Sequence, residues 1–246
     1  MVLVCFLIHK TLYAGSNRLL IKRYHWEYSI SKNRSRILPM EKIRDICMMA
    51  PVIPVLVIED LAKARPLAEA LVKGGLPVLE VTLRTPVALD AIRLMSKVPG
   101  AVVGVGTLLT PRDVAAAKSA GASFGVSPGV TDALLQSVEL EQFELLPGAA
   151  TASEVMQLLE RGYTIQKFYP AQAAGGVNML KSLAGPLPQV SFCPTGGISP
   201  QNIAEYLALS NVLCAGGSWI TPASLVSASD WDGIEALARE ASSFDV

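Results

Sequence analysis

Short apolar runs rich in β-branched residues alternate with Ala- and Leu-rich stretches along most of this chain. The runs start roughly 20 to 25 residues apart, which is the length of one strand–helix unit. The eight runs are Val52–Ile58, Val78–Leu83, Val102–Val105, Phe124–Val126, Phe143–Leu146, Ile165–Tyr169, Val190–Cys193 and Val212–Ala215. This rhythm predicts buried parallel strands, each followed by a helix.

The stretches between the runs carry helix signals. Four hydroxyl–proline pairs put a capping side chain before a proline at the first helical position, and Thr151 to Glu154 has the spacing of a capping box. The four pairs are Thr85-Pro86, Thr110-Pro111, Ser199-Pro200 and Thr221-Pro222. Glycines stand where C-terminal caps belong, at Gly74-Gly75, Gly121 and Gly162.

Eight strand–helix units in about 200 residues are typical of one α/β architecture, the (β/α)8 TIM barrel. We therefore expect a single barrel domain over residues 40–246. A doubly wound open sheet is the alternative, but it normally has fewer strands and gives no reason for eight even units.

Charge divides the chain at Met40. Residues 1–39 hold seven Lys or Arg and the single acid Glu27, whereas residues 40–246 hold fourteen bases and twenty acids. We interpret residues 1–39 as a disordered basic extension, or as the result of a start site assigned upstream of Met40. Its aromatic residues suggest a nucleic-acid arm as the alternative, but no periodicity organises the stretch. Nothing positive precedes the apolar residues Met1–Ile8, so we expect no signal peptide.

Composition excludes several classes of protein. The chain is 51% hydrophobic with zero net charge, and no apolar run approaches the ~18 residues that cross a bilayer, so we expect neither a membrane nor a nucleic-acid partner. Four cysteines without a C-x-x-C pair indicate reduced thiols and a cytoplasmic location. Both histidines precede Met40, so residues 40–246 can build neither a Ser-His-Asp triad nor a His-ligated zinc site.

Two strand runs contain charged residues where apolar ones belong. Residues two apart share a face of a strand, so Glu80, Thr82 and Arg84 point together. A carboxylate in mid-strand is costly without a task or a partner, which favours a functional Glu80 over a structural Glu80–Arg84 ion pair. Lys167 lies in an aromatic strand run, where desolvation favours the neutral amine, a nucleophile toward ketones. The alternative is a lysine that extends out of the barrel end or pairs with an acid.

Two glycine-rich turns follow the seventh and eighth runs. Loops at these positions of a barrel often cradle phosphate with backbone N–H groups. The first turn contains Thr195, Gly196 and Gly197, and the second contains Gly216, Gly217 and Ser218. We expect a phosphate site there, with the two hydroxyls as additional donors.

Residues from about Pro51 to Ser243 resemble the bacterial 2-keto-3-deoxy-6-phosphogluconate (KDPG) and 4-hydroxy-2-oxoglutarate (KHG) aldolases, which are class I aldolases. The resemblance rests on six segments: Leu79–Thr85, Gly104–Thr107, Ser127–Gly129, Lys167–Ala171, Phe192–Pro200 and Gly216–Trp219. Two departures are Gln172, where the family often has Glu, and Tyr169, where Phe is common.

This resemblance implies a role for each candidate residue. Lys167 would be the Schiff-base lysine and Glu80 the general acid/base. The implied substrate-binding residues are Arg84, Thr107, Pro128, Thr195, Gly196, Gly197, Gly217 and Ser218. Of these, Arg84 and Thr107 would lie around the carboxylate and keto end, and Thr195, Gly196, Gly197 and Ser218 toward the phosphate. The resemblance also implies a homotrimer, a phosphorylated 2-keto acid as substrate and a step of the Entner–Doudoroff pathway.

The residues support the same chemistry, because a cationic imine on Lys167 is the electron sink that carbon–carbon cleavage needs. We therefore expect no cofactor and no metal. The expected products are pyruvate with glyceraldehyde 3-phosphate, or pyruvate with glyoxylate from the shorter substrate. Two alternatives stay open: a phosphate-binding barrel isomerase or synthase whose lysine only binds, and a non-catalytic sugar-phosphate binding protein.

Overall fold

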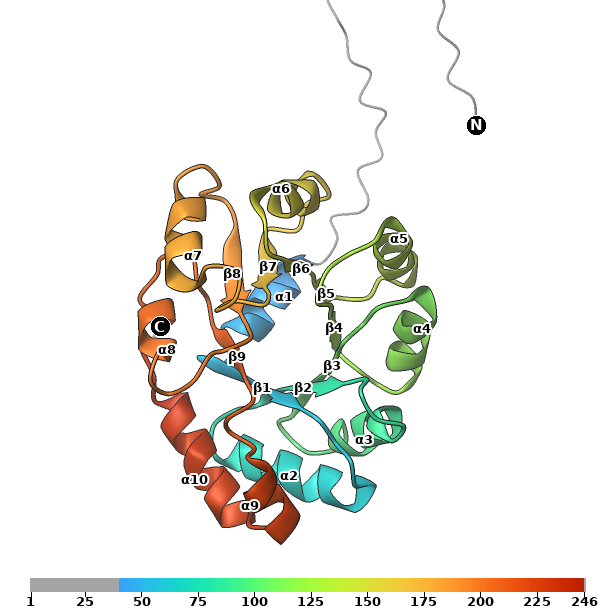
Figure 1. The fold of residues 1–246 in the computed structure, drawn as a ribbon. Helices are drawn as coiled ribbons and strands as arrows, with labels where there is room; N and C mark the ends of the chain where they lie inside the picture. The colour runs from blue at the N-terminus through green and yellow to red at the C-terminus, as the bar shows by residue number, and fades with distance from the viewer. Residues whose placement is uncertain (1–39, 246) are drawn as a thin grey trace, which may run out of the picture. The chain divides into compact units, whose positions relative to one another are not determined.

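The computed structural model describes residues 40–245, and in this part of the chain strands and helices alternate as the sequence predicts (Figure 1). The strands are β1 (Val52–Leu56), β2 (Val78–Thr82), β3 (Val102–Gly106), β4 (Phe124–Val126), β5 (Leu145–Leu146), β6 (Gly148–Ala149), β7 (Ile165–Phe168), β8 (Ser191–Pro194) and β9 (Ala215–Gly217). The helices are α1 (Met40–Cys47), α2 (Leu61–Lys73), α3 (Ala88–Met95), α4 (Pro111–Ser119), α5 (Asp132–Glu141), α6 (Ala152–Glu160), α7 (Gly176–Ala184), α8 (Ile203–Leu207), α9 (Ala223–Ala228) and α10 (Trp231–Ser242).

The strands form an α/β fold with parallel sheets. A six-stranded sheet has the order β5-β4-β3-β2-β1-β9, and a three-stranded sheet has the order β6-β7-β8. Single bridges, Phe192 to Val212 and Thr195 to Gly216, connect the segment of β8 with that of β9. The helices α2 to α10 lie outside the strands (Figure 1), so the apolar sides of the helices and sheets bury the main core between them.

Two of the five helix-start signals work as predicted. Thr110 and Asp113 form a capping box at α4, with Pro111 in the first turn, and Thr151 and Glu154 form one at α6. Each box satisfies amide groups that the first turn of a helix leaves unpaired. The predicted C-terminal turns also form, since Gly75, Gly121 and Gly162 all have positive φ.

The other three predicted helix starts are wrong. Helix α3 begins at Ala88, because the Thr85 hydroxyl donates to the carbonyl of Ile58 and does not cap. Helix α8 begins at Ile203, after Asn202 rather than after Ser199. Helix α9 begins at Ala223 with no side-chain cap.

Two strand boundaries also differ from the apolar runs. The run Phe143–Leu146 gives only Leu145–Leu146, and after Pro147 the short β6 pairs on the other side with β7. Proline has no N–H for the ladder, so pairing stops there. The run Val212–Ala215 precedes most of β9, which pairs with β1 from Ala215 to Gly217. An apolar run marks burial, whereas a strand also needs an aligned neighbour.

Helix α1 is an element that the strand–helix rhythm does not predict. It precedes β1, and Ile43, Ile46 and Cys47 pack against residues such as Val78 and Ile165, which open their strands. This second core contains only small and medium apolar side chains, Phe124 and three buried thiols. Helix α1 therefore covers the amino ends of the strands, and substrates must reach the site from the carboxyl ends.

The expectations for residues 1–39 lie outside the described residues. Within the described part of the chain, no helix is long and apolar enough to cross a membrane.

Candidate active site

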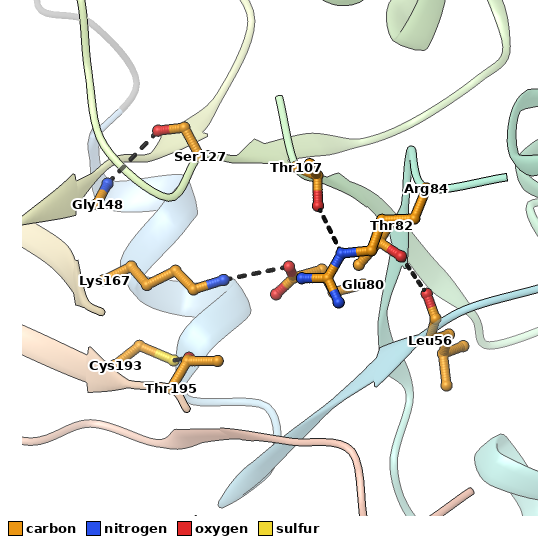
Figure 2. Close-up of polar contacts among 10 residues, drawn as sticks. All are labelled: Leu56, Glu80, Thr82, Arg84, Thr107, Ser127, Gly148, Lys167, Cys193 and Thr195. Carbon is orange, nitrogen blue, oxygen red and sulfur yellow. Dashed lines mark hydrogen bonds and ion pairs between the residues drawn. The ribbon is translucent and has the colours of Figure 1, made fainter. Parts of the chain in front are cut away.

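Strands β2 and β7 bring the two unusual charged residues together. The Lys167 ammonium donates to a Glu80 carboxylate oxygen at 3.2 Å, and the side chains reach toward each other from separate strands (Figure 2). Glu80 is 3% exposed and Lys167 is 5% exposed. The structural alternative was an ion pair between Glu80 and Arg84. Among the described residues this pair does not form, and Glu80 pairs with Lys167 instead. The pair is buried, where charges interact much more strongly than in water.

Glycines on β3 make the space for this pair. Glu80 lies opposite Gly104 in the ladder, and a Cβ at Gly106 would lie 2.3 Å from a Glu80 carboxylate oxygen. On the other side of the site, the backbone of Pro128 packs against Gly148, the ladder neighbour of Lys167. These close approaches explain why glycines stand at these positions of β3 and β6.

Tyr169 and Cys193 complete the surroundings of the lysine. The Lys167 ammonium lies 5.3 Å from the centre of the Tyr169 ring, as expected for residues that share a strand face. Cys193 lies opposite Lys167 in the β7–β8 ladder and is buried. A hydrogen bond with Cys214, and then the charge of Lys167, hold the pKa of the Cys193 thiol below its ordinary value, against the effect of burial.

Thr82 and Arg84 have partners other than Glu80. The Thr82 hydroxyl donates to the Leu56 carbonyl and is occupied within the sheet. Arg84 lies beyond the end of β2, is exposed, and donates from Nε to the Thr107 hydroxyl at 3.3 Å (Figure 2). Among residues 40–245, its two terminal NH₂ groups form no hydrogen bond or ion pair. Thr107 has φ 60°, an uncommon conformation for a β-branched residue that marks a candidate functional position.

The two glycine-rich loops lie next to each other. The bridge between Thr195 and Gly216 connects them, and a Cβ at Gly216 would lie 2.3 Å from the Thr195 hydroxyl. Gly196 and Gly197 both have positive φ, and a Cβ at Gly217 would collide with the Trp219 ring. Ser218 is exposed at the end of β9. The two glycine-rich loops are therefore in direct contact with each other.

Sequence reasoning missed three contributors to the site. Cys193 could have been found, because it shares a strand face with Thr195. Asn202, which donates to the Gly197 carbonyl, and Tyr206, which donates to the Gln172 side chain, lie on or beside α8 and carry no signal in the strand pattern. In residues 40–245, no group of three His, Cys, Asp or Glu side chains is arranged to hold a metal ion.

A lysine and a carboxylate in one buried site, on parallel strands covered by helices, are what carbon–carbon cleavage through an imine requires. The protein is an aldolase, a carbon–carbon lyase of the Schiff-base type.

The chain belongs to the KDPG and KHG aldolase family, whose model matches residues 43–237. It is 52% identical over 197 residues to the KHG/KDPG aldolase of Escherichia coli K12, covering 80% of this chain and 92% of that protein. The structure is similar to that of the KDPG aldolase of Zymomonas mobilis ZM4 with 3-phosphoglycerate, at TM-score 0.81 and 51% identity, covering 84% and 97% of the two chains.

A third similar protein is the KDPG aldolase of Legionella pneumophila, at TM-score 0.79 and 48% identity, covering 81% of this chain and 98% of that one. Its structure holds pyruvate as a covalent carbinolamine intermediate. A carbinolamine is the first adduct of an amine with a ketone, which is the chemistry inferred above for Lys167.

Proposed function

We propose that this protein cleaves 2-keto-3-deoxy-6-phosphogluconate to pyruvate and glyceraldehyde 3-phosphate, and 4-hydroxy-2-oxoglutarate to pyruvate and glyoxylate. The observation that carries the proposal is the buried contact of 3.2 Å between Lys167 and Glu80. The first reaction is the aldol cleavage step of the Entner–Doudoroff pathway.

Lys167 is the nucleophile in this proposal. Proton transfer from its ammonium to Glu80 leaves a neutral amine, which attacks the C2 ketone to give a carbinolamine. Glu80 returns this proton to the carbinolamine hydroxyl, which leaves as water, so that a cationic imine and a Glu80 carboxylate remain. The Tyr169 ring, 5.3 Å from the nitrogen, stabilises a cation at this position.

Glu80 carries the protons of the cleavage step. Its carboxylate accepts the proton of the C4 hydroxyl as the C3–C4 bond breaks, and the electrons of that bond move into the imine to form an enamine. The aldehyde leaves, Glu80 returns the proton to C3, and water releases pyruvate from Lys167. Protons and electrons balance without another reactant.

The remaining candidate residues bind the two ends of the substrate. Arg84 and Thr107 bind the carboxylate, since a guanidinium with two unused NH₂ groups matches a carboxylate in bidentate geometry. Pro128 lines the wall beside Lys167. The glycine-rich loops, Thr195 to Gly197 and Gly217 to Ser218, bind the phosphate.

We also propose that the two sheets belong to one closed (β/α)8 barrel. Only Pro147 separates β5 from β6, and the two bridges between the β8 and β9 segments lie where the ring would close. The resemblance to the family further predicts a homotrimer, which sedimentation velocity would test. The three described cysteines are free and buried, which supports the expected cytoplasmic location; localisation of a tagged protein would test it.

Cleavage assays test the proposed function. The wild-type protein should release pyruvate from both keto acids, and Lys167→Ala should release none. A phosphate-binding isomerase would convert a sugar phosphate without releasing pyruvate, and a binding protein would turn over neither substrate. Either result would contradict the proposal.

A further inference from the structure

The loop Thr195–Ile198 is held from outside by three hydrogen bonds to consecutive carbonyls. The Ala171 amide donates to Thr195 O at 2.8 Å, and the Gln172 amide donates to Gly196 O at 3.0 Å. The Asn202 side chain donates from Nδ2 to Gly197 O at 2.9 Å. None of these donors belongs to a group with a role in the proposed reaction.

These bonds fix the direction of the loop amides. In a trans peptide the carbonyl and the following N–H point in opposite directions, so each carbonyl held by Ala171, Gln172 or Asn202 turns the next amide away from that donor. The Gly217–Ser218 segment directly follows Gly216, which bridges to Thr195 of this loop. Among the described residues, the amides of Gly197 and Ile198 donate to no protein acceptor. Unpaired amides in a glycine-rich turn form a binding site for an anion.

Two of the side chains that hold this region in place, Asn202 and Tyr206, lie at α8 about one helical turn apart. Asn202 precedes the helix, and its Oδ1 also accepts from the Ser199 amide at 2.9 Å, so both ends of this side-chain amide fasten the loop. Tyr206 lies one helical turn later, is 1% exposed, and donates to Gln172 Oε1 at 2.8 Å. The Gln172 side chain in turn fills the space that a Cβ at Gly197 would need.

We infer that Asn202, supported by the Tyr206–Gln172 hydrogen bond, is a positioning residue that aims the Gly197 and Ile198 amides at the substrate phosphate and sets the preference for the phosphorylated keto acid. The inference rests on the proposed function. Asn202 touches no reacting atom, so its loss should weaken phosphate binding without changing the chemistry at Lys167.

Steady-state kinetics on two substrates test this inference. Asn202→Ala should raise the KM for 2-keto-3-deoxy-6-phosphogluconate about 5- to 20-fold, as expected when two hydrogen bonds that orient a site are lost. The KM for 4-hydroxy-2-oxoglutarate, kcat, and the rate of pyruvate trapping by borohydride should change less than about twofold. Inhibition by inorganic phosphate should weaken by the same factor as the KM rises.

Two further variants complete the design. Tyr206→Phe removes one hydroxyl and keeps the ring, so the KM for the phosphorylated substrate should rise about two- to fivefold. If Asn202→Ala does not fold, Tyr206→Phe tests the inference in its place. Gln201→Ala removes an exposed amide in the same turn and is the matched control, which should change neither KM.

The inference is overturned if wild type cleaves both substrates while Asn202→Ala, or Tyr206→Phe in its place, leaves the ratio of the two KM values unchanged. An equal rise in both KM values overturns it too, because that is the effect of a merely structural residue. A wild-type protein that neither traps pyruvate nor cleaves either substrate would overturn the proposed function itself.

Discussion

Among single residues, Lys167 and Glu80 form a buried ion pair that is also the proton-transfer pair of the proposed reaction. Removing one partner of a buried pair leaves the other charge without compensation, which is costly for folding. The same proximity lets a proton move between Lys167 and Glu80 without bulk water. The contact that stabilises the resting site is therefore also the first step of the proposed reaction.

We predict that Glu80→Gln lowers kcat by about 10²–10⁴, the usual loss when a general acid/base is removed. An amide keeps the shape of the side chain but cannot shuttle protons, so pyruvate should still be trapped, only slowly. Glu144→Gln is the matched control, since Glu144 is also buried but precedes β5 and forms no hydrogen bond or ion pair with Lys167 among the described residues. Near-native cleavage by Glu80→Gln would make Glu80 a structural partner only.

Arg84 gives a second prediction. Its Nε is held by Thr107, which leaves the planar end of the guanidinium for a carboxylate. Arg84→Lys should raise the KM for both keto acids more than it lowers kcat, because an ammonium cannot bind in bidentate geometry. Steady-state kinetics measure the changes in KM and in kcat separately. An unchanged KM with a much lower kcat would instead indicate that Arg84 acts on the reactivity of Lys167 and not on substrate binding.

At the scale of elements, capping boxes stabilise α4 and α6, and the box of α6 is sensitive to pH. The hydrogen bond from the Ala150 amide, helped by Thr151, holds the pKa of Glu154 below its ordinary value. A carboxyl with a lowered pKa stabilises the folded state above its unfolded pKa, and this contribution is lost as the pH falls through the folded pKa.

We predict that Glu154→Gln lowers the free energy of unfolding by about 0.5–1 kcal/mol at pH 7, which is typical of a lost helix cap. The difference from wild type should shrink as the pH falls below the folded pKa of Glu154. Denaturant unfolding at several pH values measures it. Glu160→Gln, exposed in the last turn of the same helix, is the control. An equal loss at all pH values would contradict the assignment.

The sequence predicted most elements, because burial on strands and the first turn of a helix are local properties. Thr110 and Thr151 could be identified as caps from spacing alone. Thr85 could not, because its hydroxyl is taken by Ile58, a residue of another strand–helix unit. Pairing across the sheet likewise decided that Pro147 separates two strands. Among the candidate site residues, Glu80 and Lys167 stood out as charges in apolar strands, whereas Asn202 acts through a loop contact that no periodicity reveals.

At the scale of the whole molecule, α1 is the element on which the amino side of the site depends. It packs Ile43, Ile46 and Cys47 beneath the strands, where Cys193 and Cys214 are buried too. Cys193 lies opposite Lys167 in the ladder, so this lower core supports the lysine from below.

We predict that a chain beginning at Met40 keeps full activity and stability, because every element described here remains. A chain beginning at Ala50 lacks α1 and should unfold at lower temperature and lose activity, since the apolar residues beneath the strands become exposed. Thermal unfolding and cleavage rates compare the two. Loss of activity on removal of residues 1–39 alone would contradict our domain boundary at Met40.

The proposed reaction requires that Lys167 forms an imine with the substrate. Incubation with pyruvate and borohydride, followed by peptide mapping with mass spectrometry, tests it most directly, because reduction makes the adduct permanent. We expect one adduct per chain, on Lys167, and none in Lys167→Ala. An adduct on another lysine, or no adduct in the wild-type protein, would contradict the Schiff-base assignment.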